Sequence, residues 1–226
     1  MGILEVENDN QDKPRPRLLA EYLPCSRGSI RLAMQKKRES KVKGNKIKHI
    51  GEILVAEKII TEEELQNALR RQRSDRLAHC PGFTSLSKAE LSAISKHFTE
   101  ISVPSDKQFI FEGEEDPTMY VLVDGQLEVF IHNENGDEIH IAYVRPVQPI
   151  GEMGYFQGGT RTASVRAVTP SELLVASYKN LTHYFEHVPH VAHAFVEMVQ
   201  RRQAETNRII EDADSDDASL LEKTLQ

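Results

Sequence analysis

Residues 150–165 read Ile-Gly-Glu-Met-Gly-Tyr-Phe-Gln-Gly-Gly-Thr-Arg-Thr-Ala-Ser-Val. This stretch predicts a strand end, a glycine turn, a short helix and then an arginine that leads into the next strand. Its glycines Gly151, Gly154 and Gly159 indicate a backbone that approaches another group closely, because glycine has no side chain to obstruct the approach.

Two charged residues of this stretch predict a binding site, Arg161 for an anion and Glu152 for a hydroxyl group. A short helix offers free backbone N–H groups and a positive dipole end. Arg161 adds a planar, permanently charged fork that suits a phosphate. Glu152 lies nine residues earlier and can accept a hydrogen bond from a hydroxyl, so a ribose 2′-OH is its natural partner. The alternative is a plain buried salt bridge between Glu152 and Arg161, and the glycines weigh against it.

Gly151-Glu152 followed by Arg161-Thr162-Ala163-Ser164 resembles the phosphate-binding cassette of cyclic nucleotide-binding domains. The resemblance extends to Gly113-Glu114, residues 120–125 and residues 177–179, and it covers residues 83–210. Within that family the pattern is most similar to the bacterial cAMP receptor proteins, or catabolite activators, which are dimeric transcription activators. The resemblance implies an α+β protein with an antiparallel β-roll, a double-stranded β-helix or jelly-roll, and flanking helices.

The same resemblance implies the role of each cassette residue. Arg161 would bind the cyclic phosphate, Glu152 would bind the ribose 2′-OH, and the backbone of 151–154 would contact sugar and phosphate. Thr162 would contact phosphate or base, and Thr206-Asn207 would meet adenine across a dimer. Arg-Thr-Ala also occurs in cGMP-selective domains, so we expect cAMP and leave cGMP open. The expected ligand-binding residues are Gly151, Glu152, Met153, Gly154, Arg161, Thr162, Ala163, Thr206 and Asn207.

Short alternating segments on both sides of the cassette support an all-antiparallel sheet region. Asp124-Gly125 predicts a tight turn between strands 120–123 and 127–131. Residues 133–137 predict the next turn, before a strand over 138–144. The remaining expected elements are strands around 101–103, 109–111, 163–168 and 172–177, a short helix behind Ser87, and helices over 178–187 and 190–212.

The N-terminal part divides into an arm and a small module. We interpret residues 1–46 as a flexible, basic arm, because prolines stand in its first half and Lys and Arg dominate residues 31–48. The basic run is interpreted as a solvated linker or helix face, with an acidic partner, a membrane surface or nucleic acid as alternatives.

Residues 47–78 predict two amphipathic helices, the second behind a capping box of Thr61 and Glu64. Residues 50–69 resemble the N-terminal helical module of type II secretion and type IV pilus ATPases, some of which bind cyclic di-GMP in tandem copies. One copy is present here, so a docking helix pair is the interpretation, and a second ligand stays open. Two such helices are expected to lack a core of their own, so residues 47–73 would bind a protein partner, and the resemblance suggests one of a motility or secretion system.

Composition points to a soluble cytoplasmic protein. The net charge of −7 over 226 residues argues against general nucleic-acid binding. Cys25 and Cys80 provide no disulfide framework, which favours a reducing compartment, and no apolar stretch reaches the length of a membrane span. The activators of the family continue into a helix-turn-helix, whereas residues 211–226 here predict an acidic, disordered tail, so we expect no DNA binding.

We therefore expect a non-enzymatic cyclic nucleotide effector or adaptor. The alternatives are a cGMP-selective protein, a degenerate β-roll with a scaffolding role, and a phosphodiesterase. The last would need metal ligands, and no cysteine or paired carboxylate completes a set with His183, His187, His190 and His193, so no metal or catalytic residue is expected. A homodimer is expected through a seam on the last helix, although Phe195 and Met198 could instead pack on the β-roll. The seam residues are Val191, Phe195, Met198, Arg202, Glu205 and Ile209.

Overall fold

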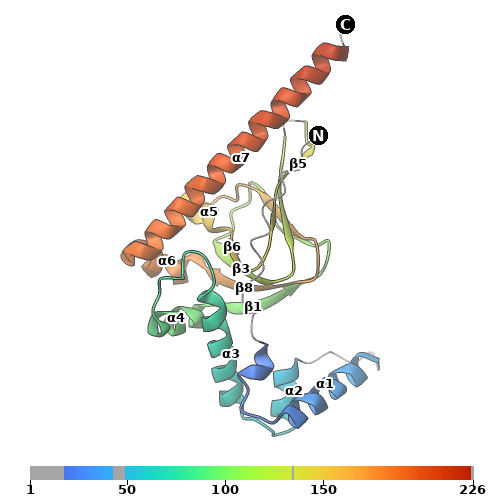
Figure 1. The fold of residues 1–226 in the computed structure, drawn as a ribbon, viewed down its shortest axis with the longest axis vertical. Coiled ribbons are helices and arrows are strands. Elements are labelled where there is room, and N and C mark those ends of the chain that lie inside the picture. Colours follow the sequence, from blue (N-terminus) through green and yellow to red (C-terminus); the bar gives the residue numbers. More distant parts are fainter. Residues whose placement is uncertain (1–17, 43–48, 134, 225–226) are drawn as a thin grey trace. The chain divides into compact units, whose positions relative to one another are not determined.

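The computed structural model describes residues 18–42, 49–133 and 135–224 (Figure 1). Its backbone contacts divide the chain into two units, residues 1–72 and 73–226. Within the described residues, no helix combines the length and the apolar composition that crossing a membrane requires.

Unit 1 is a small helical bundle with a core of its own. It contains a 3-10 turn (Leu19–Glu21), α1 (Arg27–Val42), α2 (Ile50–Ala56) and most of α3 (Glu62–Leu77). The predicted capping box is confirmed, because the Thr61 N–H donates to Glu64 Oε2 at 2.7 Å and the Glu64 N–H donates to Thr61 Oγ1 at 3.1 Å. The core residues are Tyr22, Leu23, Ala33, Ile53, Leu54, Ile60, Leu65 and Ala68.

Two predictions for this region are wrong. Residues 18–42 of the supposed flexible arm contain a 3-10 turn and α1, which begins after Pro24 and contains no proline. For the basic run from residue 31, the helix face is the interpretation that is observed. Tyr22, Leu23 and Ala33 cover the apolar stripe of α2 and α3, so this stripe does not need another protein to bury it. Residues 1–17 and 43–48 of the arm lie outside the described residues.

Unit 2 contains the predicted antiparallel β-roll. Its two four-stranded sheets have the orders β1-β8-β3-β6 and β2-β7-β4-β5, with all neighbours antiparallel. A core that includes Leu122, Leu127, Val165 and Leu173 fills the roll. The strands are β1 (Thr99–Val103), β2 (Gln108–Ile110), β3 (Thr118–Asp124), β4 (Leu127–His132), β5 (Glu138–Val144), β6 (Gln148–Ile150), β7 (Ser164–Ala167) and β8 (Ser171–Ser177).

The two predicted turns have different outcomes. Asn133–Asp137 joins the paired strands β4 and β5, and the Asn133 side chain accepts from the backbone N–H of Asn135 and Asp137. Asp124-Gly125 instead lies between β3 and β4, which belong to different sheets, so these strands do not form a hairpin. Gly125 has φ +98° and lies against Ser171, where a side chain would collide, so its turn carries the chain from one sheet to the other.

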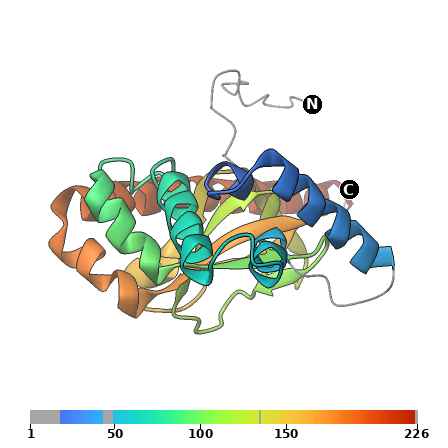
Figure 2. The ribbon, with the colours of Figure 1, turned by 90° about the horizontal axis from the view of Figure 1, so that it is seen from below.

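Helices pack against the roll. They are α4 (Lys88–Ile94), a 3-10 turn (Ser95–His97), α5 (Glu152–Phe156), α6 (Tyr178–His187) and α7 (Pro189–Thr224). The predicted Ser87 cap of α4 is confirmed, since its side chain accepts from the Glu90 N–H. Helices α4 and α6 lie at the same end of unit 2 (Figures 1 and 2) and share a core with Phe83, Phe98 and Phe195.

Helix α7 differs from its prediction in two respects. It continues to Thr224, where a disordered tail was expected from residue 211, because no glycine or proline interrupts residues 190–224. Val191, Phe195 and Met198 of the expected dimer seam are buried within their own unit. For these three residues the alternative prediction, packing on the β-roll unit, is the one observed.

Candidate functional site

The cassette, which we define as residues 151–162, begins where β6 ends. Gly151 caps the N-terminus of α5 in the left-handed conformation, with φ +79°. The other end of the cassette is held by the turn before β3. The Gly113 N–H donates to the Arg161 carbonyl at 2.8 Å, and the Arg161 N–H donates to the Glu114 carbonyl at 2.9 Å. The two motif pieces Gly113-Glu114 and Arg161 are therefore neighbours in space.

Residue Arg161 is 3% exposed, and its guanidinium is bound within the protein. Its NH1 group donates to the Gly151 carbonyl and to the Tyr178 hydroxyl, both at 3.0 Å. Its NH2 group donates to Asp116 Oδ2 at 2.6 Å and to the Thr118 carbonyl at 2.7 Å. Its Nε is buried and has no hydrogen-bond partner among the described residues. Arg161 is thus neutralised by Asp116, with one donor left over.

The groups around Arg161 have shifted pKa values. Partial burial would raise the pKa of Asp116, but hydrogen bonds from Arg161 and Thr118 and the charge of Arg161 outweigh it and lower that pKa. Burial raises the pKa of Tyr178 to about 12, against the opposing charge of Arg161. Asp116 is therefore a carboxylate and Tyr178 a neutral donor at neutral pH, and the Tyr178 hydroxyl donates to the Gly151 carbonyl.

Glu152 has a different partner. Its side chain is 1% exposed, and its Oε1 accepts from NH1 of Arg202 on α7 at 2.5 Å. Arg202 also donates to the Pro149 carbonyl at 2.9 Å. Glu152 Oε2 is buried with no hydrogen-bond partner among the described residues. Glu152 and Arg161 do not pair with each other, so the plain salt bridge between them is wrong.

The structure brings seven of the nine predicted residues together, at positions 151–154 and 161–163. The Thr162 hydroxyl lies 3.8 Å from the Met153 sulfur at the exposed rim. Thr206 and Asn207 lie on α7, about 6 Å along its axis beyond Arg202 and Gln203, and no described contact joins them to the cassette. Asn207 accepts from Gln203 at 2.7 Å, and Gln203 in turn accepts from Gln157 at 2.8 Å.

Sequence reasoning missed Asp116 and Arg202. A buried arginine and a buried glutamate each require a counter-charge, but the sequence does not say which of many acids and bases supplies it. A usable signal existed for Arg202, because it follows Met198 by one helical turn and therefore lies on the buried side of α7. We assigned that position to a dimer seam instead.

Aromatic contacts join the cassette to the closing helices. The Tyr155 ring packs on Tyr178 and Phe185, with centroid distances of 5.4 and 4.7 Å, and its hydroxyl donates to Glu186 at 2.9 Å. Phe156 stacks on Phe195 of α7 at 6.4 Å. A change in the position of α5 therefore acts directly on α6 and α7.

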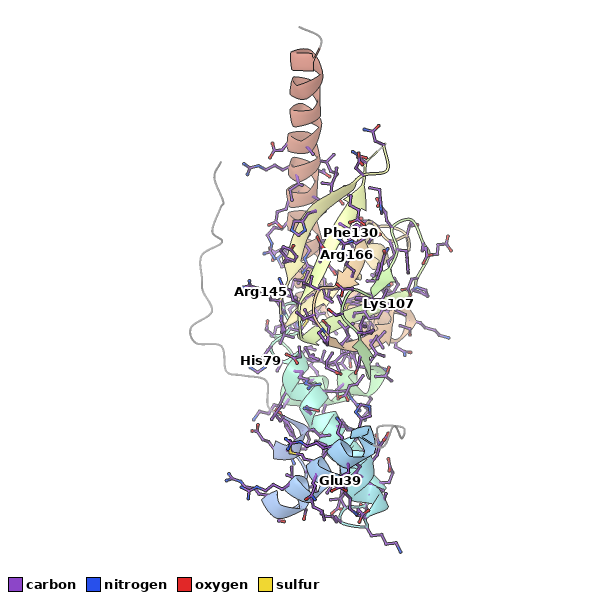
Figure 3. All side chains as sticks on the ribbon, turned by 90° about the vertical axis from the view of Figure 1, so that its right-hand side faces the viewer. Glu39, His79, Lys107, Phe130, Arg145 and Arg166 are labelled. Carbon is purple, nitrogen blue, oxygen red and sulfur yellow. The ribbon has the colours of Figure 1, made fainter. Side chains whose placement is uncertain are left out.

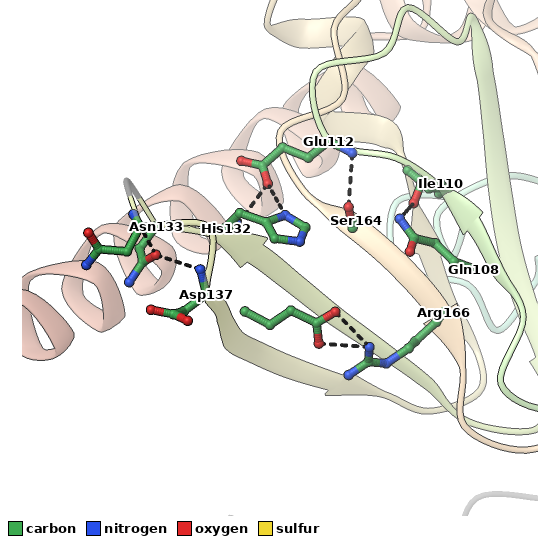
Figure 4. A network of polar contacts seen from close by, with 10 residues as sticks. Gln108, Ile110, Glu112, His132, Asn133, Asp137, Ser164 and Arg166 are labelled. Atoms are coloured by element: carbon green, nitrogen blue, oxygen red, sulfur yellow. Dashed lines mark hydrogen bonds and ion pairs between the residues drawn. The ribbon is translucent and has the colours of Figure 1, made fainter.

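A second polar network lies on the β2-β7-β4-β5 sheet. Arg166 pairs with Glu128 and Glu138, each at 2.8 Å, and lies over the Phe130 ring (Figure 3). Glu112 reaches His132 and, through its N–H, Ser164 (Figure 4). These contacts connect β4, β5 and β7. A cavity of about 390 Å³ beside them is lined by Asp106, Glu128, Tyr143, Arg166, Ala167 and Val168.

Three of the histidines of α6 and α7 contact neighbours on their own helix. The rings of His183 and His187 are 5.7 Å apart, and His193 pairs with Glu197 of its own helix at 3.1 Å. In the part of the chain that the structure describes, no group of three or more His, Cys, Asp or Glu residues is placed to hold a metal ion.

Comparison with known proteins identifies the β-roll. Residues 100–187 match the family model described as "Cyclic nucleotide-binding domain". The "cAMP-activated global transcriptional regulator CRP" of Salmonella typhimurium is 34% identical over 100 residues, which are 44% of this chain and 48% of that protein. The chain thus spans about half the length of the curated relatives it matches.

Solved structures agree on the fold. The crystal structure of the Thermus thermophilus Catabolite Activator Protein superposes with a TM-score of 0.52 at 25% identity, over 59% of this chain and 63% of that one. The regulatory subunit of a cAMP-independent protein kinase A from Trypanosoma brucei gives a TM-score of 0.54 at 17% identity, over 58% and 47%. The predicted family is confirmed for the β-roll, whereas the comparisons give no support to the secretion-ATPase resemblance of residues 50–69.

Proposed function

We propose, on the premise that residues 100–187 are a cyclic nucleotide-binding domain, that this chain binds cAMP in the cassette as a non-enzymatic, cytoplasmic signalling effector. The observation that carries the proposal is a pair of buried, unpartnered polar atoms in one cassette, Glu152 Oε2 and Arg161 Nε. An unmet buried acceptor and an unmet buried charged donor are costly. A cyclic nucleotide offers the matching groups, a ribose hydroxyl and an anionic phosphate.

Binding requires a change of partners. The phosphate competes with Asp116 for Arg161, whose terminal nitrogens are occupied without ligand. The ribose hydroxyl competes with Arg202 for Glu152, or uses the free Oε2. Since Arg202 belongs to α7, ligand binding and the position of α7 are linked, and each shifts the equilibrium of the other.

The base preference rests on Thr162, Thr206 and Asn207. Thr206 and Asn207 favour cAMP if a second copy brings them to the base, whereas the exposed Thr162 hydroxyl suits cGMP as well. A purely structural β-roll is the second candidate, and the four satisfied terminal N–H groups of Arg161 are the observation that favours it.

Calorimetric titration of the full chain with cAMP and with cGMP tests the proposal, together with Arg161→Lys. Lysine keeps the charge but lacks the guanidinium fork and Nε, so we expect affinity at least about tenfold weaker. Arg161→Ala is less informative, because it would leave the Asp116 carboxylate without its counter-charge and the Thr118 carbonyl without the donor from Arg161. Arg166→Lys, in the network on the other sheet, is the control and should bind normally.

Three outcomes decide between the candidates. Equal affinity of wild type and folded Arg161→Lys removes Arg161 from the site. Absence of binding of either nucleotide supports the structural role. If chromatography shows that the protein converts cAMP during incubation, the non-enzymatic assignment is contradicted.

We infer a homodimer through the part of α7 beyond Arg202, because the earlier apolar residues of α7 are buried in their own unit. A monomer by light scattering, with and without cAMP, would disprove it.

We also propose that the effector acts without reading DNA, and a mobility shift with duplex DNA checks this.

We propose further that residues 47–73 bind a protein partner of a motility or secretion system through exposed residues of their helices, and that nucleotide gates this binding. Leu65 belongs to the core, so an exposed residue such as Asn67 is the better test position. Recovery of the partner that is equal for wild type and Asn67→Arg, with and without cAMP, would defeat this idea.

A further inference from the structure

Helix α1 carries three arginines on one exposed side. Arg27, Arg31 and Arg38 are exposed, Met34 between them is 43% exposed, and the buried Ala33 lies on another side of the helix. We call Arg27, Arg31, Met34 and Arg38 the arginine stripe. None of its arginines forms an ion pair within the described residues, whereas Lys36 pairs with Glu57 at 2.5 Å. The stripe is therefore a row of cations without local counter-charges.

The geometry of the stripe suits another helix. Its residues recur at intervals of four, three and four, the spacing of a seam along which two helices pack, and they extend over about 17 Å of helix. A guanidinium fork pairs best with planar carboxylates. A bilayer fits less well, since exposed Leu32 lies about 160° around the helix from Met34, so the exposed apolar residues form no continuous face.

The chain also contains a helix of opposite charge. Among the described residues, Gln203 is the last residue of α7 that forms a hydrogen bond with the cassette, but α7 continues to Thr224. Residues 205–217 contain six acidic residues and one arginine, whereas α1 contains six basic residues and one glutamate. Glu205 and Glu211 are exposed. The net charge of α1 and the net charge of residues 205–217 are thus equal in size and opposite in sign.

We propose that the arginine stripe of one molecule binds the acidic segment of α7, residues 205–217, of a second copy of this chain. Three arginines along one side of α1 meet carboxylates along the other helix, and Met34 supplies an apolar contact between them. The arginine stripe lies in unit 1, outside the cassette, and its test uses no nucleotide, so the result is read separately from cyclic nucleotide binding.

The test titrates a fluorescently labelled peptide of residues 204–224 with the full-length chain and follows anisotropy. We expect saturable binding that weakens as salt is raised. The double substitution Arg31→Glu and Arg38→Glu should weaken binding at least about tenfold. A peptide with Glu211→Arg and Asp214→Arg should lose binding to wild type and recover it with the charge-reversed protein.

The matched control reverses two exposed cations elsewhere in unit 1, Lys58→Glu and Arg71→Glu. It changes the net charge by the same amount and should bind the peptide within about twofold of wild type. Equal weakening by both double variants would show unspecific attraction and overturn the proposal. The proposal would also be overturned if the peptide did not bind, or if the arginines bound vesicles of anionic lipid instead of the peptide. Circular dichroism confirms that each variant is folded.

Discussion

Gly151 is required in the cassette for two separate reasons. Its φ of +79° lies in the left-handed region, which costs other residues roughly 1–2 kcal/mol. A side chain at this position would also collide with the Arg161 guanidinium, which donates to the Gly151 carbonyl. Gly158 shares only the first property, with φ +93° and no atom within 4 Å of an added Cβ. The two glycines therefore separate backbone strain from crowding of Arg161.

We predict that Gly151→Ala destabilises the protein by about 2–5 kcal/mol, since strain and overpacking add. Gly158→Ala should cost about 1–2 kcal/mol from strain alone. Urea unfolding measures both free energies, and calorimetry should show that only Gly151→Ala loses cAMP affinity. Equal losses of stability would mean that the contact with Arg161 contributes nothing.

At this scale the sequence predicted the residue types of the site but not their partners. Gly151, Glu152 and Arg161 were identified because glycine at a turn, a carboxylate and a guanidinium each suggest their chemistry directly. Asp116 and Arg202 were not, because pairing depends on which strand and helix faces meet in three dimensions.

At the scale of elements, α7 is anchored to the cassette by its middle. Arg202 holds the buried Glu152, and Gln203 accepts from Gln157. Arg201, one position earlier, pairs with exposed Glu205 of the same helix at 3.9 Å. Adjacent arginines of one helix thus form a buried and an exposed ion pair.

We predict that Arg202→Ala destabilises the protein by about 3–5 kcal/mol, because it leaves the Glu152 carboxylate buried without its counter-charge. Arg201→Ala should cost less than about 0.5 kcal/mol, as for other exposed pairs. Chemical denaturation gives both values. Hydrogen exchange over residues 189–210 should accelerate only in Arg202→Ala, and an equal effect of both substitutions would refute the anchor.

Element positions were predictable where periodicity and caps decide them. Ser87, the Thr61–Glu64 box and the break between α6 and α7 are local signals, and each was confirmed. The assignment of β3 and β4 to different sheets was not predictable, because a Gly turn looks the same in a hairpin and at a sheet-to-sheet crossing. Helix α1 was not predicted for a related reason. Its packing on α2 and α3 is a tertiary contact, and its own sequence is rich in charged residues.

At the scale of the molecule, the two units have separate cores. The core of unit 1 surrounds Leu54, and those of unit 2 surround residues such as Phe195 and Leu173. Helix α3 supplies Leu65 to the first and Leu77 to the second. The cassette lies wholly in unit 2. A ligand that binds the native cassette therefore stabilises unit 2 directly, and unit 1 only as far as α3 couples the two.

We predict two transitions in calorimetric unfolding of the full chain, of which cAMP raises only the one that belongs to unit 2. Ligand at about 100 times its dissociation constant adds about 2.7 kcal/mol, which corresponds to roughly 5–10 °C for a unit of this size. Leu54→Ala, at a fully buried position of unit 1, should lower the other transition through a loss of about 2–5 kcal/mol and leave the cAMP-sensitive one in place. A single transition that both treatments move would contradict separate cores. It would show that α3 makes one cooperative body of the two units, and a signal generated in the cassette would then reach the helices of unit 1 through the stability of the whole chain.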